Sequence, residues 1–205
     1  MSKLFEPLKI RNTEFKNRIA VSPMCQYSAV EGFPTQWHTV HYGTRAVGGA
    51  GLIIQEATSV SPEGRISTGD LGIWNDEQTD AYKKITDFII SQNCVPGIQL
   101  AHAGRKASAH LGWEKEGSRK IEDGGWKTCA PSAAAFSEKY TLPAEMSIED
   151  INKAIEDFRL AAIRSVLAGY KLIELHFAHG YLVHEFLSPL SNFRNDIYGG
   201  SFENR

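Results

Sequence analysis

Residues 147–176 read SIEDINKAIEDFRLAAIRSVLAGYKLIELH and predict a helix followed directly by a strand. Ser147 can cap the start of a helix, and acidic residues at 149 and 150 favour the positive end of its dipole. Gly169 provides the stop, and the brief apolar run at 171–176 is typical of a buried strand. Between them an apolar stripe runs at helical spacing through Ile151, Ile155, Phe158, Ala162 and Val166.

The same alternation extends towards the N-terminus. Short β-rich runs at 18–23, 51–56 and 95–100 predict strands, and helical spacing at 35–47 and 76–92 predicts helices. Strands that alternate with helices are parallel and joined by right-handed crossovers. Spacing alone leaves two α/β architectures open: a doubly wound sheet or part of a (β/α)8 barrel.

Two segments depart from this alternation. A polar turn at 11–13 separates two short alternating runs and predicts a hairpin before the main fold. Residues 101–145 are rich in Gly, Ser, Ala and Trp and show little periodicity, which is typical of a functional loop or lid. We expect residues 1–205 to form a single domain.

Composition excludes several classes of protein. With 205 residues, 42% hydrophobic and 22% charged, the chain is an ordinary globular protein. A net charge of -2 and scattered basic residues argue against binding to nucleic acid or to an anionic membrane. Three distant cysteines indicate a reducing compartment, and no apolar run resembles a signal peptide or a membrane span. We therefore expect a cytoplasmic protein.

Chemically useful side chains follow the end of each predicted strand. Ligands bind at that end of a parallel α/β fold, because the strand ends and the following loops open there. The side chains concerned are Cys25 and Tyr27, Gln55 and Glu56, Gln99 and His102, and then His176, His179 and Tyr181.

His176 and His179 admit more than one reading. Two imidazoles at a strand-to-loop bend can donate hydrogen bonds to one oxygen and stabilise its developing negative charge, with Tyr181 as a nearby proton donor. The alternatives are structural histidines, or a metal-dependent hydrolase site that includes His102. The metalloprotease helix motif is not matched, because Phe177 stands where that motif has Glu.

Other candidate residues also have two readings each. Cys25 is either a small buried hydrophobe or a soft group that tunes a cofactor ring. The amide of Gln99 either binds the edge of a heterocycle or is satisfied by neighbouring backbone. His38 and His41 share a helix face, and we interpret them as packing residues. Trp113 and Trp126 either line a substrate pocket or anchor the long loop, and we favour anchoring.

Taken together, these residues resemble the old yellow enzyme family, and most closely its branch that includes bacterial xenobiotic reductases. The resemblance runs essentially from end to end of the sequence. It rests on LFEP (4–7), NRI (17–19), PMCQY (23–27), WH (37–38), HY (41–42), GGAGL (48–52), EAT (56–58), PEGR (62–65), QLAHAGRK (99–106) and the segment from ELH (174–176) to ENR (203–205).

The resemblance implies a (β/α)8 barrel of the TIM type that binds FMN without a covalent bond. By this similarity the flavin is lined by Pro23, Met24, Cys25, Ala57, Gln99 and His176. His176 and His179 would hold the carbonyl or nitro oxygen of an electron-poor alkene, Tyr181 would donate the proton, and Tyr27 would lie over the substrate. NADPH or NADH would reduce the flavin. No metal is implied.

The family barrel runs to about 250 residues or more, with eight strands. The resemblance therefore predicts a chain with roughly the first four βα units, preceded by the hairpin. We expect a truncated product that associates with copies of itself or with the missing half. The alternative is a non-catalytic fragment that keeps the motifs as an assembly unit.

Overall fold

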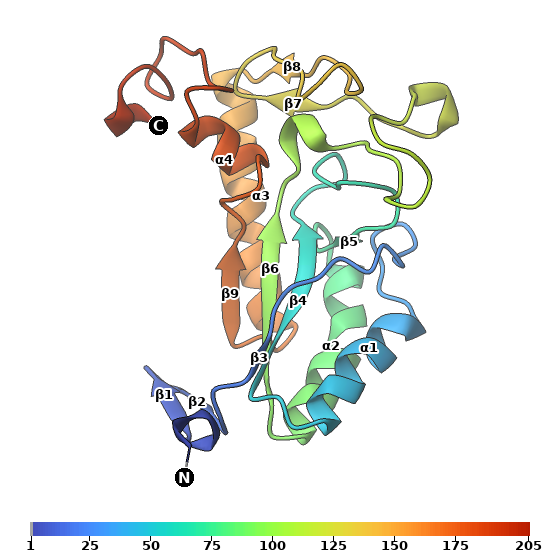
Figure 1. The fold of residues 1–205 in the computed structure, drawn as a ribbon, viewed down its shortest axis with the longest axis vertical. Coiled ribbons are helices and arrows are strands. Elements are labelled where there is room, and N and C mark those ends of the chain that lie inside the picture. Colours follow the sequence, from blue (N-terminus) through green and yellow to red (C-terminus); the bar gives the residue numbers. More distant parts are fainter. Residues whose placement is uncertain (1) are drawn as a thin grey trace.

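The computed structural model describes residues 2–205, and a parallel sheet lies at its centre. Strands β3 (Ala20–Val21), β4 (Leu52–Ser59), β6 (Val95–Ala101) and β9 (Leu172–Leu175) lie side by side in that order (Figure 1). The short β5 (Leu71–Gly72) pairs with the end of β4. This arrangement confirms the predicted parallel strands, although the first of them is paired over two residues only.

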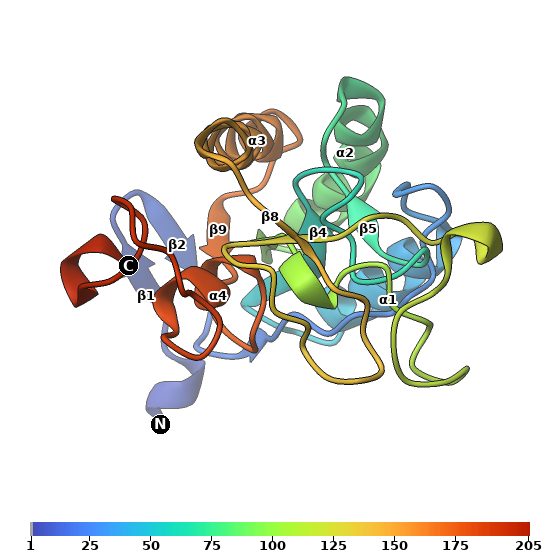
Figure 2. The same cartoon turned by 90° about the horizontal axis from the view of Figure 1, so that it is seen from above.

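Helices α1 (Gln36–Val47), α2 (Asp76–Ser91) and α3 (Ile148–Leu167) cover one face of the sheet. Seen from above, they follow one another around the strands (Figure 2). Ile53, Ile98 and Leu100 of the sheet share one buried cluster with Tyr42 of α1 and Ile85 of α2. Since side chains alternate along a strand, residues 57 and 99 face the opposite side, which we call the inner face.

Helix α3 begins at the predicted cap. The Ser147 side chain accepts a hydrogen bond from the Asp150 amide at 3.1 Å, and the Asp150 carboxylate accepts one from the Ser147 amide at 2.9 Å. The predicted apolar stripe is wrong in part, since Ile155 and Val166 are 55% and 63% exposed. The sheet ends at β9, so within the described residues only the short α4 lies beside this part of α3, and it leaves these side chains exposed.

The predicted hairpin is confirmed as β1 (Leu8–Ile10) and β2 (Thr13–Phe15), which pair antiparallel. It lies at the end of the sheet where the strands begin, and the opposite end carries β7 (Cys129–Ala130), β8 (Ala144–Glu145) and α4 (Leu182–Leu187) (Figure 1). The remaining short elements are the 3-10 turns η1 (Lys3–Phe5), η2 (Gly104–Lys106), η3 (Ile121–Asp123) and η4 (Phe202–Asn204).

The long loop predicted at 101–145 contains little regular structure but is anchored at a definite point. The Trp126 indole donates to the Glu63 carbonyl at 2.8 Å. The Arg65 guanidinium lies 4.8 Å from the Trp126 ring and 5.5 Å from the Trp74 ring. Cations held over aromatic faces in this way are attracted by the ring electrons. Trp126 is therefore an anchor of the loop, as we favoured.

Across residues 2–205, the structure contains no helix whose length and apolar character would allow it to span a bilayer.

Candidate active site at the strand ends

Three side chains form one row across the inner face. Ala57 of β4 is in register with Gln99 of β6, which is in register with Glu174 of β9. The Gln99 amide nitrogen lies 2.5 Å from a Glu174 carboxylate oxygen, so this amide is partnered by a side chain rather than by backbone. A row of this kind offers a small methyl group, an amide and a carboxylate to a planar ligand.

A β-bulge in β4 makes this row possible. Gln55 pairs with Ile98 and Ala57 with Gln99, so Glu56 is an extra residue with no partner on β6. Its carboxylate is fully buried, and it accepts hydrogen bonds from the Gln26 amide at 2.6 Å and the Tyr42 hydroxyl at 2.9 Å. Burial raises the pKa of Glu56 to about 7. The bulge thus points Glu56 away from the inner face and under the Cys25–Tyr27 segment.

The turn after β9 brings the predicted substrate residues together. The His176 ring lies 5.2 Å from the His179 ring and 5.0 Å from the Tyr181 ring, edge to face in both cases. His179 and Gly180 both have left-handed backbone, with φ of 57° and 73°. The Ala178 amide donates to His176 Nδ1 at 3.4 Å, which leaves Nε2 as the donor of that imidazole.

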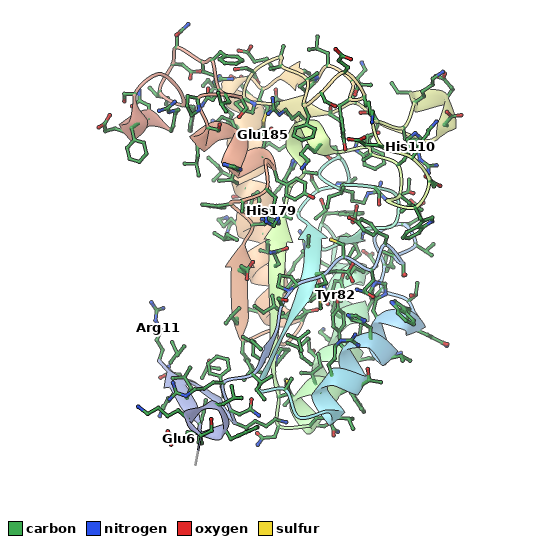
Figure 3. All side chains as sticks on the ribbon, in the orientation of Figure 1. Glu6, Arg11, Tyr82, His110, His179 and Glu185 are labelled. Atoms are coloured by element: carbon green, nitrogen blue, oxygen red, sulfur yellow. The ribbon has the colours of Figure 1, made fainter. Side chains whose placement is uncertain are left out.

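Figure 3 shows His179 just beyond the tips of β6 and β9, with Glu185 above it in α4. Arg11 and Glu6 lie at the other end of the molecule, in and beside the hairpin. The candidate site is therefore at the end of the strands where ligands bind in parallel α/β folds.

The segment after β3, at the opposite edge of the sheet from β9, approaches the same turn. Burial, and then the nearby Cys25 thiol, raise the pKa of both Tyr27 and Tyr181. Burial, with Asp70 and Glu56 adding to it, raises the pKa of Cys25 itself to about 12. All three groups keep their protons at neutral pH. The ring of Trp113 meets Tyr27 edge to face at 6.0 Å, a contact between the long loop and the segment after β3 at the rim of the site.

Sequence reasoning missed several buried charged groups around the site. Asp70 is 2% exposed and accepts a hydrogen bond from the Ser67 amide, and burial raises its pKa to about 7. Glu185 of α4 is 1% exposed, and burial raises its pKa to about 8. The partly exposed Lys106 also contacts the turn after β9, where its ammonium donates to the His179 carbonyl. The signal that could have found Glu185 is a carboxylate inside the apolar run LVHEFL.

His102 and His38 do not join the site. His102 accepts a hydrogen bond from the Gly104 amide at 3.1 Å, and burial lowers its pKa to about 4. Among residues 2–205, no group of three or more His, Cys, Asp or Glu side chains is placed to hold a metal ion. His38 accepts from the Thr35 amide at 2.9 Å at the start of α1, and its Nε2 lies 3.5 Å from Glu56 without hydrogen-bond geometry. This agrees with our interpretation of His38 as a packing residue.

The site residues suit the ring system of a flavin. Met24 is 48% exposed and Cys25 is partly exposed, which leaves a soft apolar edge at the strand ends. The Ala57 backbone lies near the Cys25 thiol and lowers its pKa against the larger effect of burial, so this edge continues into the row that contains the Gln99 amide. A planar heterocycle with polar edges needs both kinds of contact. None of the predicted flavin residues is a cation that could bind a phosphate.

An apolar groove of about 280 Å³ lies elsewhere, between α3, β9 and α4. Ile155, Leu175 and Phe186 are among the residues that line it, and no predicted site residue does so. We therefore place the chemistry at the strand ends and not in this groove.

Comparison with known proteins identifies the family. The model of the NADH:flavin oxidoreductase / NADH oxidase family matches residues 3–205. The chain belongs to this family. It is 50% identical to the NADPH dehydrogenase of Bacillus subtilis (strain 168) over 205 residues, which cover 99% of this chain and 56% of that protein. It is also 50% identical to the NADPH dehydrogenase of Bacillus cytotoxicus, covering 100% and 55%.

Solved structures of the family share the fold. Morphinone reductase aligns with a TM-score of 0.85 at 30% identity, over 98% of this chain and 55% of that one. The old yellow enzyme homologue from Zymomonas mobilis gives 0.85 at 30%, over 99% and 56%. The chain thus spans about half the length of the family members it matches. This confirms the old yellow enzyme resemblance and the prediction of part of a (β/α)8 barrel. The roles of the individual site residues stay predictions.

Proposed function

We propose that this chain carries the substrate-handling residues of an FMN-dependent oxidoreductase that reduces the activated C=C bond of α,β-unsaturated carbonyl or nitro compounds. The observation that carries the proposal is the meeting of His176, His179 and Tyr181 within ring distances of 5.0 and 5.2 Å, at the same strand ends as the Ala57–Gln99 row. Two donors and an acid beside a site for a planar ring suit this reduction.

The histidines act on the substrate oxygen. When the flavin is bound, it supplies the hydride to the β-carbon, and negative charge then develops on the carbonyl or nitro oxygen. Burial, and then His179, lower the pKa of His176, so this imidazole is neutral and donates through Nε2. Paired donors of this kind stabilise a developing oxyanion without first having to reorganise.

Tyr181 completes the reduction. Burial raises the pKa of Tyr181, so its phenol is protonated when the substrate binds. The O–H bond of Tyr181 breaks as a C–H bond forms at the α-carbon, and water returns a proton to the phenolate. Tyr27 packs on the same site from the segment after β3 and positions the substrate between the two phenols.

Cofactor binding is assigned to Pro23, Met24, Cys25, Ala57, Gln99 and His176. Gln99 would meet the polar edge of the flavin ring, and Cys25, which remains a thiol, would lie beside the ring as a polarisable group. We propose a nicotinamide nucleotide as the reductant. In support, two relatives are named NADPH dehydrogenases, and a solved relative is morphinone reductase in complex with tetrahydroNAD.

The test is a spectrum followed by two half-reactions. The purified chain is titrated with FMN and freed of unbound flavin. NADPH should then bleach the flavin band, and cyclohexenone should restore it. In the H176A/H179A double variant, the band should remain but its recovery with cyclohexenone should slow at least 100-fold, the usual range for lost oxyanion donors. Recovery at the normal rate in this variant would disprove the assigned role.

A second candidate is that the chain acts only when further βα units complete the barrel. It is favoured by the exposed apolar side of α3, where Ile155 and Val166 are uncovered next to the edge strand β9. Family members are nearly twice as long, which makes those units the proposed occupant of that side. If NADPH bleaching and recovery with cyclohexenone occur only after the remaining segment of a relative is added, this candidate is correct; both half-reactions in the chain alone exclude it.

A further inference from the structure

Lys106 joins the turn after β6 to the turn after β9. Its ammonium donates to the His179 carbonyl at 3.0 Å and lies 4.9 Å from the centre of the Tyr181 ring. The same ammonium lies 4.6 Å from the Phe136 ring of the long loop. The Lys106 ammonium thus contacts both His179 and Tyr181, the two residues that act with His176 in the proposed mechanism.

The turn that Lys106 contacts is strained. His179 has φ of 57°, a conformation that residues other than Gly rarely adopt. Its neighbour Gly180 has φ of 73°. Such backbone persists only where its surroundings hold it. A charged donor to the His179 carbonyl is a restraint of the right strength, because hydrogen bonds to ionised groups are the stronger ones.

Lys106 is itself fixed in place. It ends η2, whose Arg105 amide donates to the Glu185 carboxylate at 3.0 Å. A Cβ on Gly104 would come within 2.4 Å of that carboxylate, so η2 packs tightly against α4. The carbonyl of His102 accepts from the Leu182 amide at 3.0 Å. The turn after β6 is therefore linked to the turn after β9 and α4 by several contacts, and these contacts fix the backbone that carries Lys106.

We propose that Lys106 is a positioning residue for the reduction: it holds the His179–Tyr181 turn in the conformation that gathers the two imidazoles and the phenol, and its ammonium stabilises the Tyr181 phenolate left by proton transfer. The second part rests on the proposed function. When the Tyr181 O–H bond breaks and the proton reaches the α-carbon, negative charge spreads into the ring whose face Lys106 covers. Water then restores the phenol.

The first experiment needs no flavin. Hydrogen exchange is measured at the Gly180 and Tyr181 amides, which donate to His184 Nδ1 at 2.8 Å and to the Ala178 carbonyl at 3.2 Å and so report opening of the turn. Lys106→Met keeps an unbranched side chain that is one atom shorter and removes its charge. Exchange should accelerate about tenfold, the loss expected for one charge-assisted hydrogen bond.

Two variants serve as controls in that experiment. Lys120→Met changes a lysine that is 73% exposed and should leave exchange unchanged. Lys106→Arg keeps a cation and should restore most of the protection. Equal exchange at both amides in Lys106→Met and the unmodified protein would overturn the positioning role, whatever the flavin-loaded protein does.

The second experiment uses the flavin-loaded protein, completed with further βα units if those are needed. In Lys106→Met the limiting rate of flavin reoxidation by cyclohexenone should fall about tenfold, because the phenolate loses its neighbouring cation, and half-saturation with cyclohexenone should rise, because the loosened turn no longer holds the two imidazoles together. An unchanged limiting rate overturns the phenolate role. If the unmodified protein never reduces cyclohexenone, the proposed function fails, and the exchange result alone then decides the positioning role.

Discussion

The imidazole of His176 meets the phenol of Tyr181 edge to face, with the ring centres 5.0 Å apart and the planes at 81°. His176 leaves β9 on the inner face, whereas Tyr181 precedes α4, and the strained turn between them brings the two rings together. In the proposed mechanism, a substrate whose oxygen is held by the His176 imidazole would have its α-carbon facing the Tyr181 phenol.

Tyr181→Phe should separate packing from proton donation. The variant keeps the ring contact with His176 and removes the proton, so protein stability should change by less than about 1 kcal/mol. Flavin reoxidation by cyclohexenone should slow about 100-fold, the lower range for loss of a general acid. Stopped-flow absorbance measures that rate. Tyr198→Phe, which alters a phenol outside the site, should have no such effect, and a normal rate in Tyr181→Phe would assign the proton to another donor.

Stability should fall as pH rises from 6.5 to 8. Burial raises the pKa of Glu185 to about 8, so the folded state retains a proton that the unfolded state has already released. The stabilisation of the folded state by protonated Glu185 is fully present below pH 4.5 and is lost as the pH rises through 8. Glu56 and Asp70, whose pKa values burial raises to about 7, add to the loss of stability in the lower part of this window. His38 and His102, whose pKa values burial lowers to about 4, contribute fully above pH 6.5 and do not change in this window.

Glu185→Gln should flatten this dependence. A neutral amide mimics the protonated acid, so the slope of the unfolding free energy between pH 6.5 and 8 should decrease by up to about 1 kcal/mol per pH unit. Urea unfolding at several pH values measures the slope. Glu138→Gln, a change at an exposed carboxylate, is the control and should leave the slope unaltered. An equal slope in Glu185→Gln would show that Glu185 is not the titrating group.

Gly104→Ala should be far more damaging than Gly112→Ala. Gly104 has φ of 58° and faces the Glu185 carboxylate, whereas a Cβ at Gly112 meets nothing within 4 Å. We expect a loss of about 2 kcal/mol or more for the first and within about 0.5 kcal/mol for the second. Urea unfolding compares the two. Similar losses would mean that the tight packing of η2 on α4 does not contribute to stability.

Cys25→Ala should shift the reduction potential of bound flavin more than it alters the turnover rate. The thiol is polarisable and, with its pKa raised to about 12 by burial, uncharged, so it acts on the ring and not as a nucleophile. A shift of about 30 mV would correspond to a tenfold change in a two-electron equilibrium. Dye-coupled reduction measures it. An unchanged potential would remove Cys25 from the role of tuning the flavin.

Local signals in the sequence predicted much of the fold. The start of α3 was found because Ser147 and Asp150 cap each other across three residues. The hairpin was found from its polar turn at 11–13, where Arg11 adopts φ of 53°. Both features depend only on neighbours in the chain, so composition and spacing suffice to predict them.

Features that depend on distant residues were not predicted. The exposed side of α3 depends on where the sheet ends, which the spacing of Ile155 and Val166 does not encode. The contact between Lys106 and His179 joins residues 73 positions apart. Motif resemblance brought His176, His179 and Tyr181 to one site but gave no sign of the buried groups that support them.

The bulge at Glu56 also determines how β4 can tolerate a change in length. Because position 56 has no partner on β6, removing it would keep Gln55 towards the helices and Ala57 on the inner face. Adding one residue between 57 and 59, by contrast, would reverse the side to which every later residue of the strand points. A deletion at position 56 would therefore preserve the alternation of β4 while removing the buried carboxylate that Gln26 and Tyr42 contact.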